Sequence, residues 1–214
     1  MSVKNIAVLA SGGGTNFQAI LDAIARGEID GRVCVLIYNR KAAFAAQRAR
    51  DAGIPAVYVN RKTLGDEAFG ATVHHTLVEY GAEVVVLAGW LEILTAETVT
   101  RFPHRILNTH PALIPAFCGK GMYGHHVHQA VLDYGAKVSG CTVHFAEEGV
   151  DTGPIVAQQA VEVLPGDTAD TLAARILPHE HRLLAEAVVL LCADRLRVEG
   201  RQVIVLPKQD RVDD

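Results

Sequence analysis

The first half of this chain alternates short, β-branched apolar runs with helical patterns that end at glycine. The apolar runs occupy residues 5–10, 32–39, 56–59, 83–89 and 105–108. The helical patterns occupy residues 15–27, 42–53 and 66–81. Each closes on a glycine, the residue that most easily adopts the left-handed conformation at a helix end. Strands that are apolar on both faces and alternate with helices are typical of a parallel sheet with both faces covered.

The pattern changes after residue 110. A glycine-rich stretch, "AFCGKGMYG", leads into a helical pattern at residues 125–135. Two strand-like runs follow at residues 137–146 and 153–164, joined by the acidic turn "EEGVDT". A long amphipathic helix at about residues 168–193 and a hairpin at residues 196–206 end the pattern. We expect an α/β fold: a Rossmann-like, mostly parallel sheet with an antiparallel C-terminal extension and helices on both faces.

No linker, repeat or low-complexity tract divides the sequence. We therefore expect a single domain over residues 1–214, with a phosphate-binding half to about residue 110 and a second half over about residues 111–206. Residues 207–214, "PKQDRVDD", are expected to form a loose tail.

Composition and charge disfavour several classes of protein. Lys and Arg number 20 against 24 Asp and Glu, without a long run of either sign, which argues against a nucleic-acid partner. No window has the roughly 18 apolar residues of a membrane span, and the N-terminus lacks the pattern of a signal peptide. The four cysteines are scattered, without a C-x-x-C pair, so we expect reduced cysteines and a cytoplasmic protein.

A glycine-rich loop, "LASGGGTNFQAI", joins the first strand to the first helix. Backbone N–H groups at a helix start form a natural phosphate cradle when glycine removes side-chain bulk. The dinucleotide fingerprint is incomplete, because Gly12 and Gly14 fit it but Phe17 stands where the third glycine belongs. The loop favours one phosphate, with Thr15 and Asn16 as further donors. A tight turn without a ligand is the alternative.

Asn108 and His110 follow the fifth strand and are held extended by the proline at 111. Residues two apart in extended chain point to the same side, so an amide and an imidazole can converge on one volume. This pair suits a reaction in which a carbonyl oxygen gains negative charge while an attacking amine loses a proton. Asp151 is the best-placed carboxylate to raise the pKa of the imidazole. A histidine bonded only to backbone is the alternative.

The stretch "GHHVH" raises the question of a metal site. It contains His125, His126 and His128, with Cys118 nearby, but no H-x-x-x-H or paired-cysteine spacing. We therefore predict no metal site, and a solvated helix start in which His128 is a candidate to face the cleft.

Five motifs together resemble a known family. "SGGGTN", "LAGWLEIL", "ILNTHPALIP", "GCTVHF" and "VDTGPI" occur in the order and at the spacing of the phosphoribosylglycinamide formyltransferases, folate-dependent enzymes of purine synthesis. The resemblance covers about residues 4–195. Its most specific part is "NTHPALIP" followed by "GCTVHFAEEGVDTGP".

The resemblance implies roles by position. The catalytic residues it implies are Asn108, His110 and Asp151. The residues it implies for glycinamide ribonucleotide are Gly13, Gly14, Thr15, Asn16 and Glu180. The residues it implies for the folate pocket are Trp90, Leu91, Glu92, Ile93, Leu94, Asn108, Glu147, Glu148, Gly149 and Val150.

The implied reaction is direct transfer of the formyl group of 10-formyltetrahydrofolate to the amine of glycinamide ribonucleotide. Asn108 and His110 would stabilise the tetrahedral oxyanion, and Asp151 would keep His110 cationic or help to move the proton. The folate is a co-substrate, and neither a metal nor a tightly bound cofactor is required. The sequence allows a homodimer but does not determine the oligomeric state.

Some positions depart from the family's pattern. Glu92 and Asp66 stand where some members carry a basic residue near the glutamate tail of folate, and Leu177 replaces a polar residue on the substrate side. The loop over residues 116–126 is longer than in compact members, and its glycines suggest a mobile lid on which Lys120 meets an anionic group.

Two other functions remain open. One is a related 10-formyltetrahydrofolate-dependent transferase or hydrolase with a different acceptor. Such members usually carry an additional domain, which we do not expect in these 214 residues. The other is a non-catalytic sensor of a phosphoribosyl ligand that uses the same glycine loop.

Overall fold

The central strand, β1 (Lys4–Ala10), buries side chains on both of its faces. Ile6 and Val8 point into one part of the core, whereas Ala7 and Leu9 point into another. Successive side chains of a strand face opposite sides of the sheet, so both faces of β1 must be covered. The two core clusters therefore define two layers of helices with the sheet between them.

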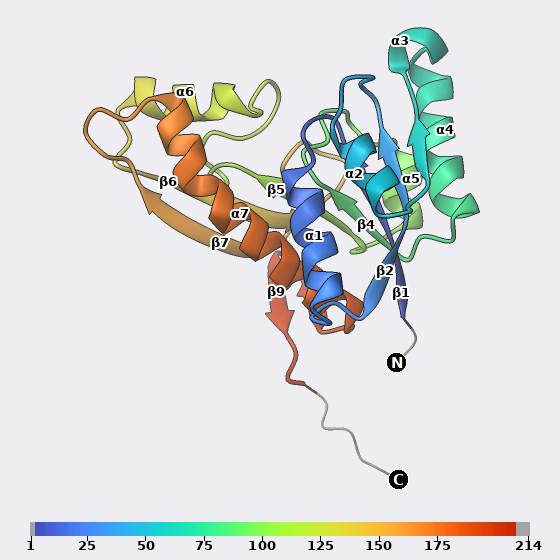
Figure 1. The fold of residues 1–214 in the computed structure, drawn as a ribbon. Coiled ribbons are helices and arrows are strands. Elements are labelled where there is room, and N and C mark those ends of the chain that lie inside the picture. Colours follow the sequence, from blue (N-terminus) through green and yellow to red (C-terminus); the bar gives the residue numbers. More distant parts are fainter. Residues whose placement is uncertain (1–2, 209–214) are drawn as a thin grey trace.

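In the computed structural model, which describes residues 3–208, the strands form one sheet in the order β3-β2-β1-β4-β5-β6-β7-β9-β8 (Figure 1). The strands after β1 are β2 (Gly31–Tyr38), β3 (Ala56–Tyr58), β4 (Val84–Leu87), β5 (Ile106–His110), β6 (Val138–Phe145), β7 (Ile155–Glu162), β8 (Leu196–Glu199) and β9 (Gln202–Val205). Strands β1 to β5 pair in parallel, whereas β5 with β6 and β6 with β7 pair antiparallel. The predicted fold class is confirmed.

Helices cover both faces. One layer contains α1 (Thr15–Ala25), α2 (Ala45–Asp51), α6 (His125–Tyr134) and α7 (Ala169–Cys192). The opposite layer contains α4 (Asp66–Glu79) and α5 (Ala96–Arg101). The glycines that end the first three predicted helices, Gly27, Gly53 and Gly81, have φ angles of 73°, 68° and 62°, as a left-handed helix end requires.

Two short helices were not predicted, and both begin at a side-chain cap. The side chain of Asn60 accepts a hydrogen bond at 2.9 Å from the backbone N–H of Lys62 and starts α3 (Arg61–Leu64). Thr95 accepts from the N–H of Thr98 at 3.3 Å and starts α5. Such caps are local signals, but each helix is too short to show a 3.6-residue period. The predicted tail lies outside the described residues from residue 209 onward.

The sheet brings the segments of the candidate site together. The parallel strands β4 and β5 end at one edge, with Leu87 opposite Asn108. The antiparallel strand β6 places His144 opposite Asn108 on the other side. The turn that follows β6 then returns toward the same edge. Gly153 makes this close return possible, because a Cβ at this position would lie 1.8 Å from the carbonyl oxygen of Phe145.

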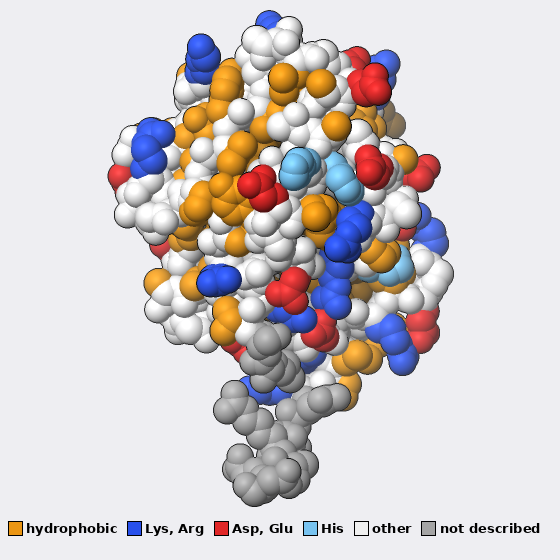
Figure 2. Space-filling model, turned by 90° about the vertical axis from the view of Figure 1, so that its right-hand side faces the viewer, with side chains coloured by type: hydrophobic (Ala, Val, Ile, Leu, Met, Phe, Trp, Pro, Cys, Tyr) orange, Lys and Arg blue, Asp and Glu red, His pale blue; other side chains and the backbone are white. Residues whose placement is uncertain are grey.

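On the face that carries α4, basic and acidic side chains are interspersed (Figure 2). In the part of the chain that the structure describes, we find no helix with the length and apolar character that a membrane span needs.

We expect Phe17→Ala to lower the free energy of unfolding by about 3–5 kcal/mol, because the cavity left by a fully buried phenyl ring collapses only in part. Phe17 is 0% exposed and lies in the core between α1 and the sheet. Denaturant unfolding measures the change. Phe44, which is 55% exposed, provides the matched control, and Phe44→Ala should cost less than about 1 kcal/mol. Equal losses in the two variants would contradict this account of the core.

Candidate active site

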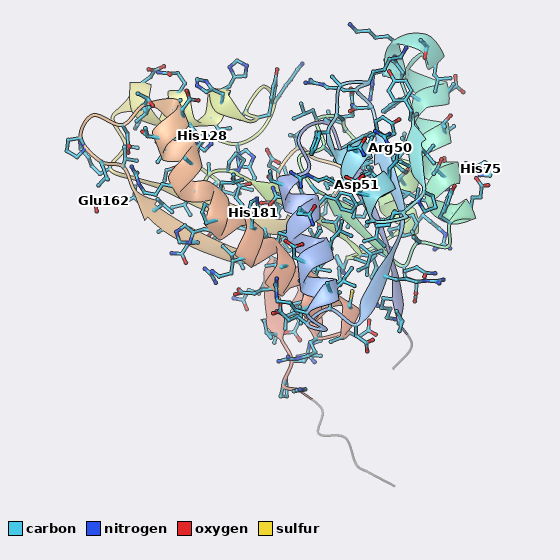
Figure 3. All side chains as sticks on the ribbon, in the orientation of Figure 1. Arg50, Asp51, His75, His128, Glu162 and His181 are labelled. Atoms are coloured by element: carbon cyan, nitrogen blue, oxygen red, sulfur yellow. The ribbon has the colours of Figure 1, made fainter. Side chains whose placement is uncertain are left out.

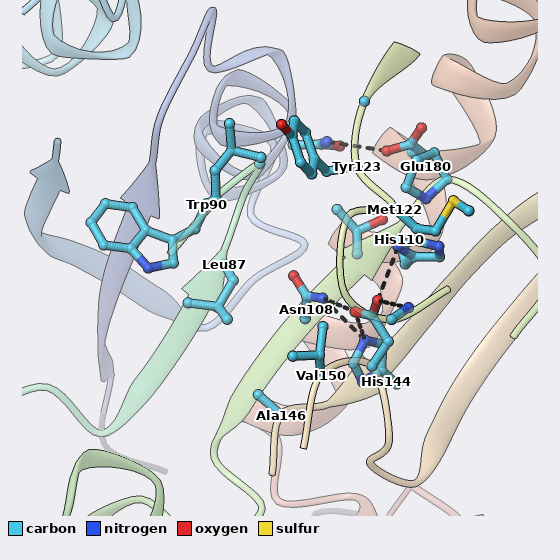
Figure 4. Close-up of a pocket in the computed structure, with 18 of the residues that line it drawn as sticks. Leu87, Trp90, Asn108, His110, Met122, Tyr123, His144, Ala146, Val150 and Glu180 are labelled. Carbon is cyan, nitrogen blue, oxygen red and sulfur yellow. Dashed lines mark hydrogen bonds and ion pairs between the residues drawn. The ribbon is translucent and has the colours of Figure 1, made fainter. Parts of the chain in front are cut away.

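A cavity of about 720 Å³ opens at the edge where β4 and β5 end (Figure 4). Its walls come from the segment after β4, the end of β5, the loop over residues 116–126, the start of α6, the turn after β6 and one face of α7. One side is apolar and includes Leu87, Trp90 and Val150, whereas the other carries the buried polar residues Asn16 and Glu180. An apolar cavity with a few convergent polar groups is the usual form of a small-molecule site.

His110 lies in this cavity at the end of β5 and is 3% exposed. Its Nε2 is 2.8 Å from the backbone oxygen of Phe117. A carbonyl oxygen only accepts hydrogen bonds, so Nε2 carries a proton. Nδ1 lies 3.6 Å from Oδ2 of Asp151. A neutral ring therefore turns an unprotonated nitrogen toward the carboxylate, and a second proton on that nitrogen would create an ion pair.

The pKa of His110 is lower than the ordinary value for histidine. Burial lowers it most, and the carbonyl of Phe117 and the carboxylate of Asp151 oppose that effect only in part. Asp151 raises the pKa of this imidazole, as expected, but burial lowers it by more, so the net shift is downward. The resting ring is neutral at neutral pH, and it is positioned to accept a proton when the reaction releases one.

Asn108 and His144 form a second hydrogen-bonded unit beside His110. Nδ1 of His144 lies 2.8 Å from the backbone oxygen of Phe145, so this nitrogen is protonated and Nε2 is an acceptor. The side-chain amide of Asn108 donates to that Nε2 at 3.0 Å and to Oδ1 of Asp151 at 3.4 Å. Both amide protons are thus engaged inside the protein, whereas we expected them to point at a substrate oxygen.

His144 is a candidate residue for which the sequence reasoning assigned no role. It is 1% exposed, and its Nε2 lies 3.6 Å from Oδ1 of Asp151. The motif "GCTVHF" was noted for its family likeness alone. Only the antiparallel register of β5 with β6 shows that this histidine sits opposite Asn108.

Asp151 joins the two units. It has a φ of 56°, a conformation that aspartate adopts more readily than most residues and that often occurs at functional sites. Its Oδ2 accepts a hydrogen bond at 2.9 Å from the backbone N–H of Gly119. Burial alone would raise the pKa of Asp151, but His144, this N–H and His110 together outweigh burial and lower it. The group is therefore a carboxylate at neutral pH.

The glycine loop begins α1 beside this cavity. Gly14 has a φ of 69°, and a Cβ there would lie 2.8 Å from the Cβ of Ala45, so a glycine is required. Gly13 has open space around it, and its carbonyl accepts a hydrogen bond at 2.9 Å from Nε of Arg48. Sequence reasoning missed Arg48, because α2 is brought against the loop only in the fold. Of the four residues predicted in this loop, Gly13, Gly14 and Thr15 lie outside the cavity lining, whereas Asn16 lies within it.

Glu180 faces Asn16 from α7, with 3.5 Å between Oε2 of the acid and Nδ2 of the amide. Glu180 is 9% exposed. Burial raises its pKa from 4.5 to about 7, and the contact with Asn16 acts in the opposite direction. An acid that titrates near neutral pH is able either to donate or to accept a hydrogen bond from a ligand hydroxyl.

We expect Glu180→Gln to remove a pH dependence of stability. In the wild-type protein, the folded state holds the Glu180 proton from pH 4.5 up to about 7 while the unfolded state releases it, so stability falls as pH rises through this window. The full effect is of the order of 3 kcal/mol. Unfolding free energies of the two proteins measured from pH 4.5 to 7.5 test this, and a constant difference between them would contradict it.

The segments predicted for folate line the apolar end of the cavity. Nearly all of them are in its wall: Trp90, Leu91, Glu92, Ile93, Leu94, Asn108, Glu147, Gly149 and Val150. Glu148 is exposed and lies outside the lining. Trp90 serves both the core and the cavity, because it is 7% exposed and stacks on Phe69 with ring centroids 6.1 Å apart.

The two acidic departures from the family's pattern share one basic partner that sequence reasoning missed. Arg61 lies 2.8 Å from an oxygen of Glu92 and 2.9 Å from an oxygen of Asp66. Its guanidinium also stacks over the ring of Phe69 at 4.7 Å. The charges at this rim are therefore paired within the protein.

The loop over residues 116–126 closes one side of the cavity. Gly119, Gly121 and Gly124 have positive φ angles, and Lys120 is exposed at the lining. Within residues 3–208, no group of three His, Cys, Asp or Glu residues is arranged to hold a metal ion.

Known proteins resemble this chain in sequence and in fold. A family model described as formyl transferase matches residues 4–188. The chloroplastic phosphoribosylglycinamide formyltransferase of Arabidopsis thaliana is 44% identical over 196 residues, which cover 91% of this chain and 67% of that protein.

Two solved structures extend the comparison. Glycinamide ribonucleotide transformylase 1 from Symbiobacterium toebii superimposes with a TM-score of 0.90 and 45% identity, over 96% of this chain and 95% of that one. The phosphoribosylglycinamide formyltransferase from Anaplasma phagocytophilum gives a TM-score of 0.86 and 32% identity, over 98% and 97%. This chain belongs to the formyl transferase family and is an enzyme related to the phosphoribosylglycinamide formyltransferases.

Proposed function

We propose that this enzyme transfers the formyl group of 10-formyltetrahydrofolate to the primary amine of glycinamide ribonucleotide, a step of purine synthesis. The observation that carries the proposal is the convergence of Asn108, His110 and Asp151 in one cavity that is apolar at one end and polar at the other. The apolar end suits the flat pterin ring of a folate. The polar end, next to the glycine loop, suits a phosphoribosyl group.

The proposed reaction is direct. The amine nitrogen attacks the formyl carbon, a C–N bond forms to the acceptor, and the bond from that carbon to N10 of the folate breaks. The amine loses a proton, and N10 gains one. Holding both reactants in one cavity makes the encounter effectively unimolecular, which supplies a large share of the acceleration.

Asn108 would stabilise the negative charge on the formyl oxygen, and His110 would accept the proton that the amine releases. The Asn108 amide donates one of its hydrogen bonds to the developing oxyanion, and the longer bond to Asp151, at 3.4 Å, is the easier one to exchange. His110 takes a proton on Nδ1 and becomes an imidazolium opposite the Asp151 carboxylate, 3.6 Å away. The resulting ion pair forms only while the reaction is in progress, so it lowers the barrier more than it stabilises the resting state.

A turnover assay with three arms tests the proposal. With glycinamide ribonucleotide and 10-formyltetrahydrofolate, we expect equal amounts of formylated product and deformylated folate. With folate alone, we expect no formate, whereas steady release of formate would identify a hydrolase. Binding of glycinamide ribonucleotide by calorimetry without any turnover would identify a sensor, and transfer to other amines only would identify a different acceptor.

A further inference from the structure

A second imidazole, that of His128, lies in the same cavity and takes no part in the proposed chemistry. His128 is in the first turns of α6 and lies beside the N-terminal part of α7 (Figure 3). The residue is 4% exposed and lines the cavity, whereas its helix neighbours His125 and His126 are exposed. Its Nδ1 is buried and has no hydrogen-bond partner among the described residues.

The neighbouring helix α7 offers His128 few hydrogen-bonding groups. The face of α7 that lines the cavity follows helical spacing through Asp170, Ala173, Ala174, Leu177 and Glu180. The middle of this stripe is apolar and offers no hydrogen-bonding group. Asp170 at its outer end is exposed and lies 3.5 Å from His125. The apolar middle of this neighbouring face therefore offers His128 no hydrogen-bond partner.

Buried polar groups in native proteins are nearly always hydrogen-bonded, so a buried histidine that lines a cavity without a recorded partner calls for a ligand. A second unpartnered atom lies in the same cavity, because Oδ1 of Asn16 is also buried without a partner. Asn16 marks the end of the cavity at the glycine loop, and His110 marks the reacting centre. His128 lies close enough to His110 for a charge on one ring to disfavour a charge on the other.

The charge state of His128 limits what it would bind. Burial lowers the pKa of His128, and His125 and His110 lower it further. A neutral imidazole offers one donor and one acceptor and therefore matches a hydroxyl or an amide. A phosphate would favour a cation instead, and Arg48 and the backbone N–H groups of the glycine loop are better placed for that role.

We propose that His128 is a specificity-determining residue that hydrogen-bonds a neutral polar group of the acceptor substrate, between its phosphate and its reacting amine. This inference rests on the proposed function for the identity of the acceptor. The group is either a ribose hydroxyl or the amide of the glycinamide arm, both of which combine donors and acceptors.

Kinetics of three variants test this role. We expect His128→Leu to raise KM for glycinamide ribonucleotide about 10-fold or more, because a bound polar group would lose its partner in a desolvated site. The KM for 10-formyltetrahydrofolate should stay within about twofold of the wild-type value. His128→Asn carries an amide near the position of Nδ1, and His128→Gln carries one near Nε2. Nδ1 is sealed from solvent, whereas Nε2 is not among the buried unpartnered atoms, so Nε2 is the nitrogen that a ligand in the cavity would reach, and the glutamine variant should restore more of the affinity.

His126→Leu, on the same helix but exposed, is the control and should leave both KM values unchanged. Calorimetry of wild type and His128→Leu with ribose 5-phosphate separates the two candidate groups. An equal loss of affinity for the truncated ligand assigns the contact to a ribose hydroxyl, and an unchanged affinity assigns it to the glycinamide arm.

Two results would overturn the inference. One is a KM for glycinamide ribonucleotide within twofold of wild type in a folded His128→Leu variant. The other is an equal rise in both KM values, which would indicate a purely structural role. If the wild-type enzyme transfers no formyl group to glycinamide ribonucleotide, the proposed function fails instead, and the ribose 5-phosphate titrations still report on His128.

Discussion

Replacing His110 with alanine should reduce turnover by about 10²–10⁴-fold, the range that a positioned acid–base residue contributes. The ring is the group placed to take the amine's proton, and its Nδ1 lies 3.6 Å from the Asp151 carboxylate that would stabilise the resulting charge. Formation of product is measured at saturating concentrations of both substrates, together with thermal unfolding. The variant should remain folded, at a cost of about 1–3 kcal/mol for the Phe117 carbonyl that loses its donor.

His75→Ala provides the control for this measurement. His75 is an exposed histidine on α4, on the outside of the molecule (Figure 3). Its removal should leave turnover unchanged. Turnover of the folded His110→Ala variant within a few-fold of wild type would exclude the imidazole from the proposed chemistry.

The pH dependence of wild-type kcat/KM gives a second readout for His110. The neutral ring is the form that accepts a proton, so activity should be lost as pH falls through the pKa of His110. Because burial lowers that pKa, this acidic limb should lie below the ordinary histidine value of 6.5. An acidic limb above that value would contradict the neutral resting ring.

Replacing Asp151 with asparagine should also reduce turnover by at least about 10²-fold. Both carboxylate oxygens accept hydrogen bonds, Oδ1 from the Asn108 amide at 3.4 Å and Oδ2 from the N–H of Gly119 at 2.9 Å. An asparagine side chain has one NH₂ group in place of an oxygen, so one of these donors would face another donor. The variant also lacks the negative charge that stabilises the His110 imidazolium.

Asp151→Asn has a consequence that a structural role would not produce. Because Asp151 opposes the effect of burial on the pKa of His110, its neutralisation should move the titration of the His110 ring to still lower pH. NMR of the ring protons measures this shift directly. Asp133→Asn, on the exposed side of α6, is the control and should change neither turnover nor titration. If the pKa of His110 does not change in Asp151→Asn, the proposed electrostatic coupling between Asp151 and His110 is wrong.

Much of the fold was predictable because its signals are local. The apolar runs of β1 and β4 are buried on both faces, and Gly27, Gly53 and Gly81 end their helices in the left-handed conformation. Each feature depends on a few neighbouring residues and on a period of 2 or 3.6. The helices α3 and α5 escaped prediction because they have caps but too few residues to show a period.

The residues of the candidate site also fall into two groups, those that local sequence signals predict and those that they do not. The spacing of Asn108 and His110 at the end of a strand already pointed to one volume, and the turn containing Asp151 was a reasoned candidate for the third group. The positions of His144, Arg48 and Arg61 in the site could not be predicted from the sequence, because each reaches its partners through strand pairing or helix packing. No local pattern records such a contact.

The α/β order of strands and glycine-ended helices can be read from the amino-acid sequence, and so can the polar residues that follow the buried strands. The sign of the His110 pKa shift, the pairing of both Asn108 protons within the protein and the lack of a partner for Nδ1 of His128 follow only from the packed fold. The physical reason is that desolvation and hydrogen-bond pairing depend on every group packed around an atom. In this enzyme those groups come from β5, β6, α6, α7 and the loop over residues 116–126, which only the complete fold brings together.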